Sequence, residues 1–295
     1  MAKRQDWFFI AILIAAAGIM AFFFISFFWG LSGEEDFSLG SGDRIGLVEV
    51  KGIILDSEHT VRLLDRFRED ESIHAIMLRI DSPGGGVAAS QEIYEAVKRA
   101  RDSGKFVIAS MGSVAASGGY YIACGADTIM ANPGTTTGSI GVVAEMINMT
   151  ELMKKIGIEF NIIKSGRFKD SGTPFRKMDE ADRGYLQRYV NDAYQQFVQV
   201  VARERHLELQ KVLGYADGRV YTGQQAKDLG LVDLLGTYHD AIALTADVAG
   251  LEGKPRLVTE RKRRRLTLLD LLLGDIEEHL QWLQTMPVLR YQMVF

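Results

Sequence analysis

A serine followed by two glycines is the pattern in this chain with the clearest chemical use. It occurs at Ser117–Gly119, after the apolar run 106–109 and before the helix-like segment 120–124. Small residues let the backbone approach a ligand closely. The first N–H groups of a helix are unpaired and lie at its positive end, which suits a serine whose attack creates an oxyanion. Ser117 is therefore a candidate nucleophile. The alternative is a tight strand-to-helix turn in which the serine only caps the helix.

A serine hydroxyl needs a base, and the sequence offers two kinds. The five histidines lie in polar surroundings away from the glycine-rich turns, so a Ser-His-Asp triad has no support in the sequence. A lysine can serve where burial and nearby positive charge depress its pKa toward neutrality. Lys164 and Lys169 both flank a glycine turn after the apolar run Phe160–Ile163, which we expect to be a strand. Either could equally be a surface lysine.

Composition excludes several other kinds of chemistry. The formal net charge of −4 over 295 residues gives no general basic field for nucleic acid. Cys124 is the one cysteine, so no intrachain disulfide is possible, and its apolar surroundings predict a small core residue. No Cys/His cluster has the spacing of a zinc site. We expect no metal and no cofactor.

The first residues predict a membrane anchor. The segment 7–31 is apolar and uncharged, and at 1.5 Å per residue it is long enough to cross a hydrocarbon core of about 30 Å. Lys3 and Arg4 precede it and acidic residues follow it, which predicts a cytoplasmic N-terminus (1–6) and an external remainder. The alternative is a cleaved signal peptide, but no small-residue cleavage site is evident. A Ser/Gly/acidic linker follows at 32–43.

The region 44–250 alternates β-like runs with helix-like segments. This alternation predicts one α/β domain with parallel strands and right-handed crossovers. In such domains, sites gather at the carboxyl ends of strands, where the Gly84 and Ser117 turns fall. The helix-like segments that we expect lie at 59–67, 88–101, 151–156, 179–205, 224–229 and 238–248.

Four motifs occur in a fixed order along this domain. They are Asp81–Gly85, Ala115–Tyr121, Thr137–Gly141 and Lys164–Asp170. Together they resemble the short, single-domain form of signal peptide peptidase A, a family of membrane proteases with a Ser/Lys dyad. The resemblance covers residues 45–248 and includes the N-terminal anchor.

The resemblance implies a fold, a mechanism and a location. The fold would be of the ClpP/crotonase type, a spiral of ββα units. Ser117 would be the nucleophile, Lys169 the general base and Ser139 the residue that orients the lysine, with an oxyanion hole from Gly84, Gly85 and Gly118. The protein would form a homo-oligomer in the bacterial inner membrane. Its catalytic domain, periplasmic or extracellular, would degrade released signal peptides and other apolar peptides.

Two other functions are compatible with the pattern. A crotonase-type acyl-CoA enzyme would use the same fold, but the anchor, the outside location and the Ser117/Lys169 pair argue against it. A catalytically inert, membrane-anchored scaffold is the second alternative, and it would have no activated serine.

The C-terminal extension 251–295 matches none of these motifs. It carries the basic run 261–265, an apolar helix-like stretch at 266–283 and an apolar tail at 293–295. We favour an oligomer contact, in which these apolar segments cover the site of a neighbouring subunit. The alternative is a contact with an anionic lipid surface.

Overall fold

The computed structural model describes residues 44–251, 253, 255–260 and 290–292. The predicted anchor at 7–31, the basic run at 261–265 and the helix-like stretch at 266–283 lie outside the described residues. Among the described residues, no helix combines the length and apolar composition that crossing a bilayer requires. The domain limits at 44 and 250 stay predictions.

Three long parallel strands form the centre of a nine-stranded sheet in the described part of the chain. They are β1 (Arg44–Ile54), β2 (Ile73–Gly86) and β3 (Phe106–Ala116), with β2 between the other two. Continuous apolar runs such as Ile76–Leu78 suit strands that are buried on both faces, and these side chains are fully buried. The predicted α/β class with a parallel sheet is confirmed.

Strand β3 has two successive partners on one side. Its residues Ile108–Ser110 pair with β4 (Thr128–Ala131), and its last residues Val114–Ala116 pair with β5 (Thr136–Gly138). The sheet therefore changes neighbours along a single strand, which fits the expected ClpP/crotonase-like fold. The smaller strands are β6 (Val220–Thr222), β7 (Leu234–Leu235), β8 (Arg256–Val258) and β9 (Arg290–Gln292).

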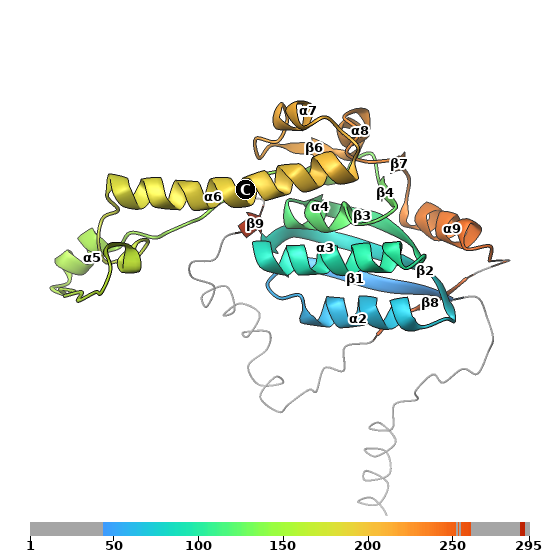
Figure 1. Ribbon diagram of the computed structural model, residues 1–295, viewed down its shortest axis with the longest axis horizontal. Helices are drawn as coiled ribbons and strands as arrows, with labels where there is room; N and C mark the ends of the chain where they lie inside the picture. The colour runs from blue at the N-terminus through green and yellow to red at the C-terminus, as the bar shows by residue number, and fades with distance from the viewer. Residues whose placement is uncertain (1–43, 252, 254, 261–289, 293–295) are drawn as a thin grey trace, which may run out of the picture. The chain divides into compact units, whose positions relative to one another are not determined.

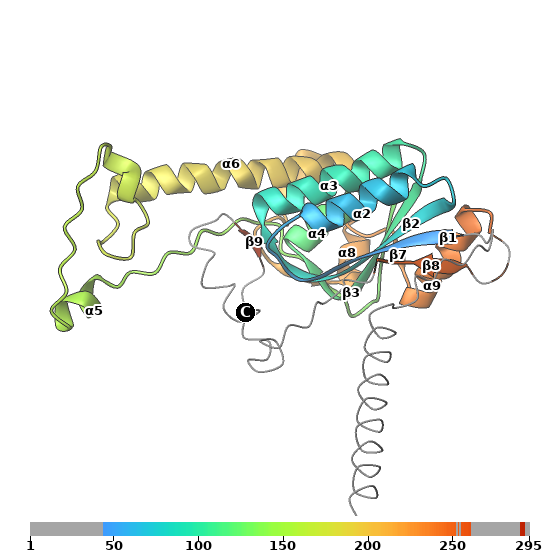
Figure 2. The same cartoon turned by 90° about the horizontal axis from the view of Figure 1, so that it is seen from below.

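Helices cover both faces of this sheet (Figures 1 and 2). On one face, α2 (Glu58–Glu69), α3 (Val87–Asp102) and α4 (Gly118–Ala123) bury the main core. On the other, α9 (Tyr238–Val248) packs on a smaller cluster that includes Leu47 and Met77. The remaining helices of the body are α7 (Leu209–Leu213) and α8 (Gly223–Asp228).

A long helix carries a segment that extends beyond this body. Helix α6 (Glu180–Glu204) packs on the body through its C-terminal half, where most of its buried residues lie. Residues 144–179, here called the arm, hold α5 (Thr150–Lys155) and the 3-10 turn η1 (Arg167–Asp170). Both views show α5 and its flanking loops past the N-terminal end of α6.

The strand expected at Phe160–Ile163 is wrong. These residues have no regular secondary structure, and the Ile163 side chain is fully exposed. A strand needs a neighbouring strand for its backbone hydrogen bonds, and the arm offers none. The apolar side chains instead pack locally, as where Phe160 stacks on Phe175 with ring centroids 3.7 Å apart.

Candidate active site

Ser117 lies in the connection between β3 and α4, in an unusual backbone conformation. Its φ is 54° and its ψ is −117°. Only two other non-glycine residues in the described part of the chain have positive φ, namely Ser139 and His206. Such a conformation costs on the order of 1–3 kcal/mol and persists only where the surroundings enforce it. Here the Ser117 N–H donates to the Gly138 carbonyl at 2.8 Å, which fixes the turn.

The Ser117 side chain is fully buried, and its Oγ has no hydrogen-bond partner in the structure. Buried hydroxyls are usually paired, because an unpaired one forfeits its hydration. The serine therefore combines a strained backbone with an unsatisfied hydroxyl, at the end of a parallel strand. None of the histidines that the structure describes forms a hydrogen bond with this Oγ.

Ser139 lies next to Ser117 through the backbone. Ala116 pairs with Gly138 where β3 meets β5, so the two serines follow residues that are opposite each other. Ser139 also has positive φ, at 51°, and its N–H donates to the Arg219 carbonyl at 2.8 Å. The structure thus brings the turns of Ser117 and Ser139 together.

The three predicted oxyanion glycines also meet. A Cβ added to Gly118 would lie 3.2 Å from both Gly84 Cα and Gly85 N, so only glycine allows this approach. The Gly84 N–H donates to Ser82 Oγ at 3.1 Å, and Ser82 Oγ donates to the Gly52 carbonyl at 2.6 Å. Because the Gly84 N–H already donates to Ser82, the N–H of Gly118 at the start of α4 is the stronger candidate donor to the oxyanion.

The edge of β2 beside these glycines is covered by the chain's own C-terminal region. Strand β9 pairs antiparallel with Gly84–Gly86, with Tyr291 opposite Gly85. It also lies beside α3 and α4, the latter being the helix that begins after Ser117. The segments that we expected to cover the site of a neighbouring subunit, 266–283 and 293–295, lie outside the described residues, whereas residues 290–292 of the same extension pair with β2 of their own chain. This edge therefore pairs with an extended segment of the same chain, which is the backbone geometry that β-augmentation uses.

Lys169 is not brought to Ser117 within this chain. It is exposed on η1, and its Nζ has no hydrogen bond or ion pair with any residue that the structure describes. Turn η1 packs on the start of α6, where Ser171 bonds to Asp182 at 2.6 Å. Helix α6 contacts α4 through its C-terminal half, where the Phe197 ring centroid lies 5.1 Å from that of Tyr121. Because an α-helix rises 1.5 Å per residue, Asp182 and Phe197 are about 22 Å apart along α6.

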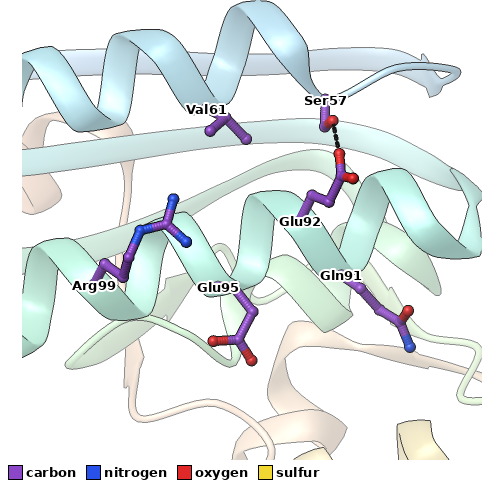
Figure 3. A pocket seen from close by; sticks show the side chains of 6 residues that line it. All are labelled: Ser57, Val61, Gln91, Glu92, Glu95 and Arg99. Carbon is purple, nitrogen blue, oxygen red and sulfur yellow. Dashed lines mark hydrogen bonds between the residues drawn. The ribbon is translucent and has the colours of Figure 1, made fainter.

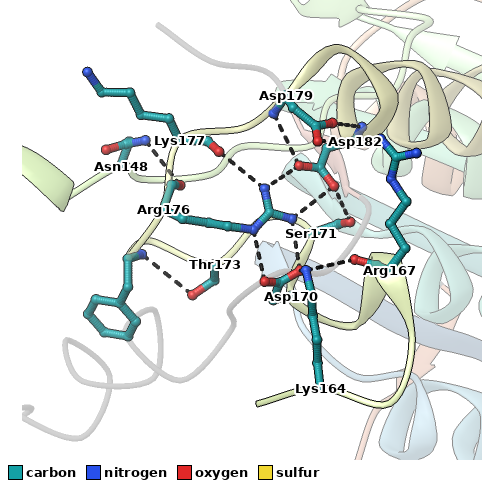
Figure 4. A network of polar contacts seen from close by, with 11 residues as sticks. Asn148, Lys164, Arg167, Asp170, Ser171, Thr173, Arg176, Lys177, Asp179 and Asp182 are labelled. Carbon is teal, nitrogen blue, oxygen red and sulfur yellow. Dashed lines mark hydrogen bonds and ion pairs between the residues drawn. The ribbon is translucent and has the colours of Figure 1, made fainter. Parts of the chain in front are cut away.

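Lys164, the other candidate base, is part of an ion-pair network (Figure 4). Its Nζ donates to Asp170 at 2.6 Å and to the Arg167 carbonyl at 3.0 Å. Both lysines come from the same stretch, but only Lys169 has an ammonium that is not held by a neighbouring side chain.

Cys124 is a core residue, as predicted. Its side chain is buried, and burial raises the pKa of its thiol to about 12. A protonated thiol is a poor nucleophile, so Ser117 has no cysteine competitor. In the part of the chain that the structure describes, no group of three or more His, Cys, Asp or Glu side chains is arranged to hold a metal ion.

A surface pocket lies elsewhere, between α2 and α3 (Figure 3). It contains none of the predicted site residues. Ser57 hydrogen-bonds to Glu92 across it, which links the two helices. Its lining is Ser57, Val61, Gln91, Glu92, Glu95 and Arg99.

The structure adds residues that sequence reasoning missed. Ser82 holds the glycine turn, and Ser90 on α3 is fully buried, with its Oγ donating to the Gly86 carbonyl at 2.9 Å. Ser82 lies inside a motif, and its small polar side chain between Asp81 and Pro83 is the signal that could have identified it. Arg176, which contacts the residue after Lys169, lies outside the motifs that we used.

Known proteins share this sequence pattern. The profile described as peptidase family S49 matches residues 99–252, a range that contains Ser117 and Lys169. A Synechocystis protein with the provisional name of protease is 44% identical over 217 residues, covering 73% of this chain and 78% of its own. An Enterococcus faecium protein, provisionally named signal peptide peptidase SppA, is 35% identical over 223 residues, covering 71% of this chain and 65% of its own. The chloroplastic serine protease SPPA of Arabidopsis thaliana is 34% identical over 238 residues, covering 80% of this chain and 35% of its own.

Proposed function

This chain belongs to peptidase family S49 and is a serine protease, and from that premise we propose a membrane-anchored endopeptidase with a Ser117/Lys169 dyad. Its substrates would be released signal peptides and other apolar peptides outside the cytoplasm. The observation that carries the proposal is Ser117, a strained and buried serine with an unpaired hydroxyl beside three glycines. Strain of this kind concentrates at active sites, where function requires it.

The chemistry follows from these groups. A neutral Lys169 amine takes the proton of the Ser117 hydroxyl as Oγ attacks the scissile carbonyl, and the Gly118 N–H donates to the oxyanion. The ammonium then returns that proton to the leaving amine, which leaves an acyl-enzyme. A water molecule, deprotonated by the same lysine, releases the acid and restores the serine. Ser139 would orient the lysine from the neighbouring turn.

A second copy of the chain would supply the lysine. Within one chain, the arm keeps η1 far from α4, so the dyad needs another source of Lys169. The arm also exposes many large apolar side chains, and large exposed apolar patches mark interaction sites. Its large apolar side chains with more than a third of their surface exposed are Ile147, Leu152, Ile156, Ile158, Phe160, Ile162, Ile163, Phe168 and Met178. Packing against a neighbouring body would bury these side chains and shield the amine from water.

Substrates would bind as an extended strand on the edge of β2. The support for this mode is β9, which pairs there through Gly84–Gly86. Backbone hydrogen bonds at such an edge do not depend on sequence, which suits a protease that acts on many apolar peptides.

Mixing two inactive variants tests the dyad. Full-length Ser117→Ala and Lys169→Ala chains should each fail to cleave an internally quenched apolar peptide and fail to react with a fluorophosphonate. After dissociation and reassembly at equal ratio, about a quarter of the sites should regain activity, because one chain supplies the serine and its neighbour the lysine. The matched control is the Lys164→Ala chain, which should be active without a second variant because Lys164 is not the proposed base. Full activity of the Ser117→Ala chain would exclude the proposed nucleophile. A reassembled mixture without peptidase activity would exclude a lysine supplied by a second copy.

A further inference from the structure

Arg176 connects a carboxylate of the arm, Asp170, with a carboxylate on α6, Asp182 (Figure 4). Its Nε and Nη2 donate to the two oxygens of Asp170 at 2.9 and 2.8 Å, a bidentate pair. Its Nη2 and Nη1 donate to the two oxygens of Asp182, the former at 3.0 Å. The planar fork of arginine suits this double grip, whereas a lysine ammonium does not reproduce it.

The two carboxylates are buried although the arm around them is exposed. The Asp170 side chain is 8% exposed and that of Asp182 is 1% exposed, whereas residues 157–169 are all exposed. Asp182 also accepts hydrogen bonds from Ser171 Oγ and from the Asp179 N–H. The Arg176 guanidinium holds the pKa of both carboxyls well below their ordinary range. Both groups are therefore charged and fully paired.

This network takes the place of a hydrophobic core under η1. The turn buries no apolar side chain of its own, and one stacking contact, Phe168 on Tyr185, supplements the ions. Asp170 is the residue directly after Lys169, so fixing its carboxylate fixes the Lys169 backbone relative to α6. Asp182 closes the capping box that begins α6, which ties the turn to a rigid element.

We propose that Arg176 is a positioning residue for Lys169, clamping Asp170 to Asp182 so that η1 presents the lysine in one orientation. The inference rests on the proposed function, because it assigns a role to the base of that dyad. A dyad requires reacting atoms about 3 Å apart, and a misplacement of about 1 Å can cost on the order of 10²-fold in rate. A turn without a core would otherwise leave the lysine with a wide range of positions.

The test compares two replacements of Arg176 in the full-length, assembled protein. Arg176→Ala and Arg176→Lys should both lower kcat by about 10²-fold on an internally quenched apolar peptide while KM changes less than about twofold. The pH at which kcat/KM reaches half its maximum should rise in both, because the amine leaves its site on the neighbouring body. The sedimentation coefficient should stay unchanged. Arg167→Ala is the matched control, since Arg167 lies on η1 but its guanidinium contacts the exposed Asp179 and the Phe168 ring instead of the two buried carboxylates; its kcat should be near that of the wild type.

Each outcome decides between explanations. If Arg176→Lys restores kcat, or if activity and assembly fall together, Arg176 only stabilises the arm and the inference is wrong. Should the Arg176→Ala chain fail to fold, Asp170→Asn keeps the side-chain shape and should give the same loss of kcat and the same pH shift. Lys169→Ala, measured in parallel, separates a failure of the proposed dyad from a failure of the positioning role of Arg176. An active Lys169→Ala chain refutes the proposed base, whereas an inactive one beside a fully active Arg176→Ala chain refutes the positioning role alone.

Discussion

Replacing Ser117 by glycine should make the protein more stable while it removes the proposed nucleophile. Ser117 holds a φ of 54°, which glycine adopts without a steric penalty. Its buried Oγ has no partner, so the hydroxyl loses its hydration without compensation. Both features would be unfavourable in a serine that had no task other than to end a strand.

The expected gain can be estimated term by term. The backbone strain costs on the order of 1–3 kcal/mol, and the buried unpaired hydroxyl costs about 1–3 kcal/mol. Glycine also lowers the free energy of unfolding by roughly 0.5–1 kcal/mol, because it gives the unfolded chain greater conformational freedom. The lower limits of the two gains, set against the upper limit of this loss, leave a net stabilisation of at least about 1 kcal/mol. Ser117→Ala removes the hydroxyl but keeps the strain, so it should gain less.

Urea denaturation of the full-length chain, followed by far-ultraviolet circular dichroism, measures both variants against the wild type. Tryptophan fluorescence is unsuitable, because Trp7, Trp29 and Trp282 all lie outside the described domain. In thermal scans, about 1 kcal/mol corresponds to a rise in Tm of about 2–4 °C for a domain of this size. A Ser117→Gly chain less stable than the wild type would refute the reasoning from strain. Equal gains for Gly and Ala would assign the whole cost to the hydroxyl.

Three further outcomes are expected. Deleting residues 290–295 should raise kcat/KM for short peptides, because β9 then no longer competes for the edge of β2; unchanged kinetics would contradict this competition. Because the pKa values of Asp170 and Asp182 are lowered in the folded state, their stabilising effect is present above the ordinary carboxyl pKa of about 4 and is lost as the pH falls below it. Hydrogen exchange in 164–182 should therefore accelerate relative to the body in acid, and uniform exchange would oppose this. For topology, alkaline phosphatase fused after Val248 should be active and the chain should resist carbonate extraction; an inactive fusion would place the domain in the cytoplasm.

The sequence predicted the elements that carry local signals. The helix at Glu180–Glu204 has a capping box at Asp179 and Asp182, and its predicted limits of 179–205 differ by one residue at each end. The glycine-rich segments of Gly84 and Gly118 were expected at strand ends, and the structure places Gly84 in the last residues of β2 and Gly118 just after β3, in contact with each other. Such features follow from residue type and spacing over a few positions, which is why the α/β class and the place of these glycines at strand ends could be anticipated, whereas their grouping into one oxyanion hole came from the family resemblance.

Features that depend on distant partners could not be predicted in this way. Phe160–Ile163 is apolar enough for a strand, but no other strand lies beside it in the arm. Nothing in the spacing of Ser117 and Lys169 reveals that α6 holds them apart. The grip of Arg176 on Asp170 and Asp182 joins an arm loop to the first turn of a helix, and arginine is common enough on surfaces for the residue to attract no attention. The pairing of β9 with β2 joins the C-terminal extension to a central strand of the domain, far apart in the sequence.

Under the proposed function, the placement of these parts would also restrict when the protease can act. In a single chain, Ser117 is fully buried, the edge of β2 is occupied by β9, and η1 holds Lys169 away on the arm. Hydrolysis would then require two events, the arrival of an arm from a second copy and the exchange of β9 for a substrate strand. The first depends on chain concentration and the second on the affinity of the peptide, so each can be varied separately. An isolated newly made chain would satisfy neither condition, and a protease built in this way would be inactive until it is assembled.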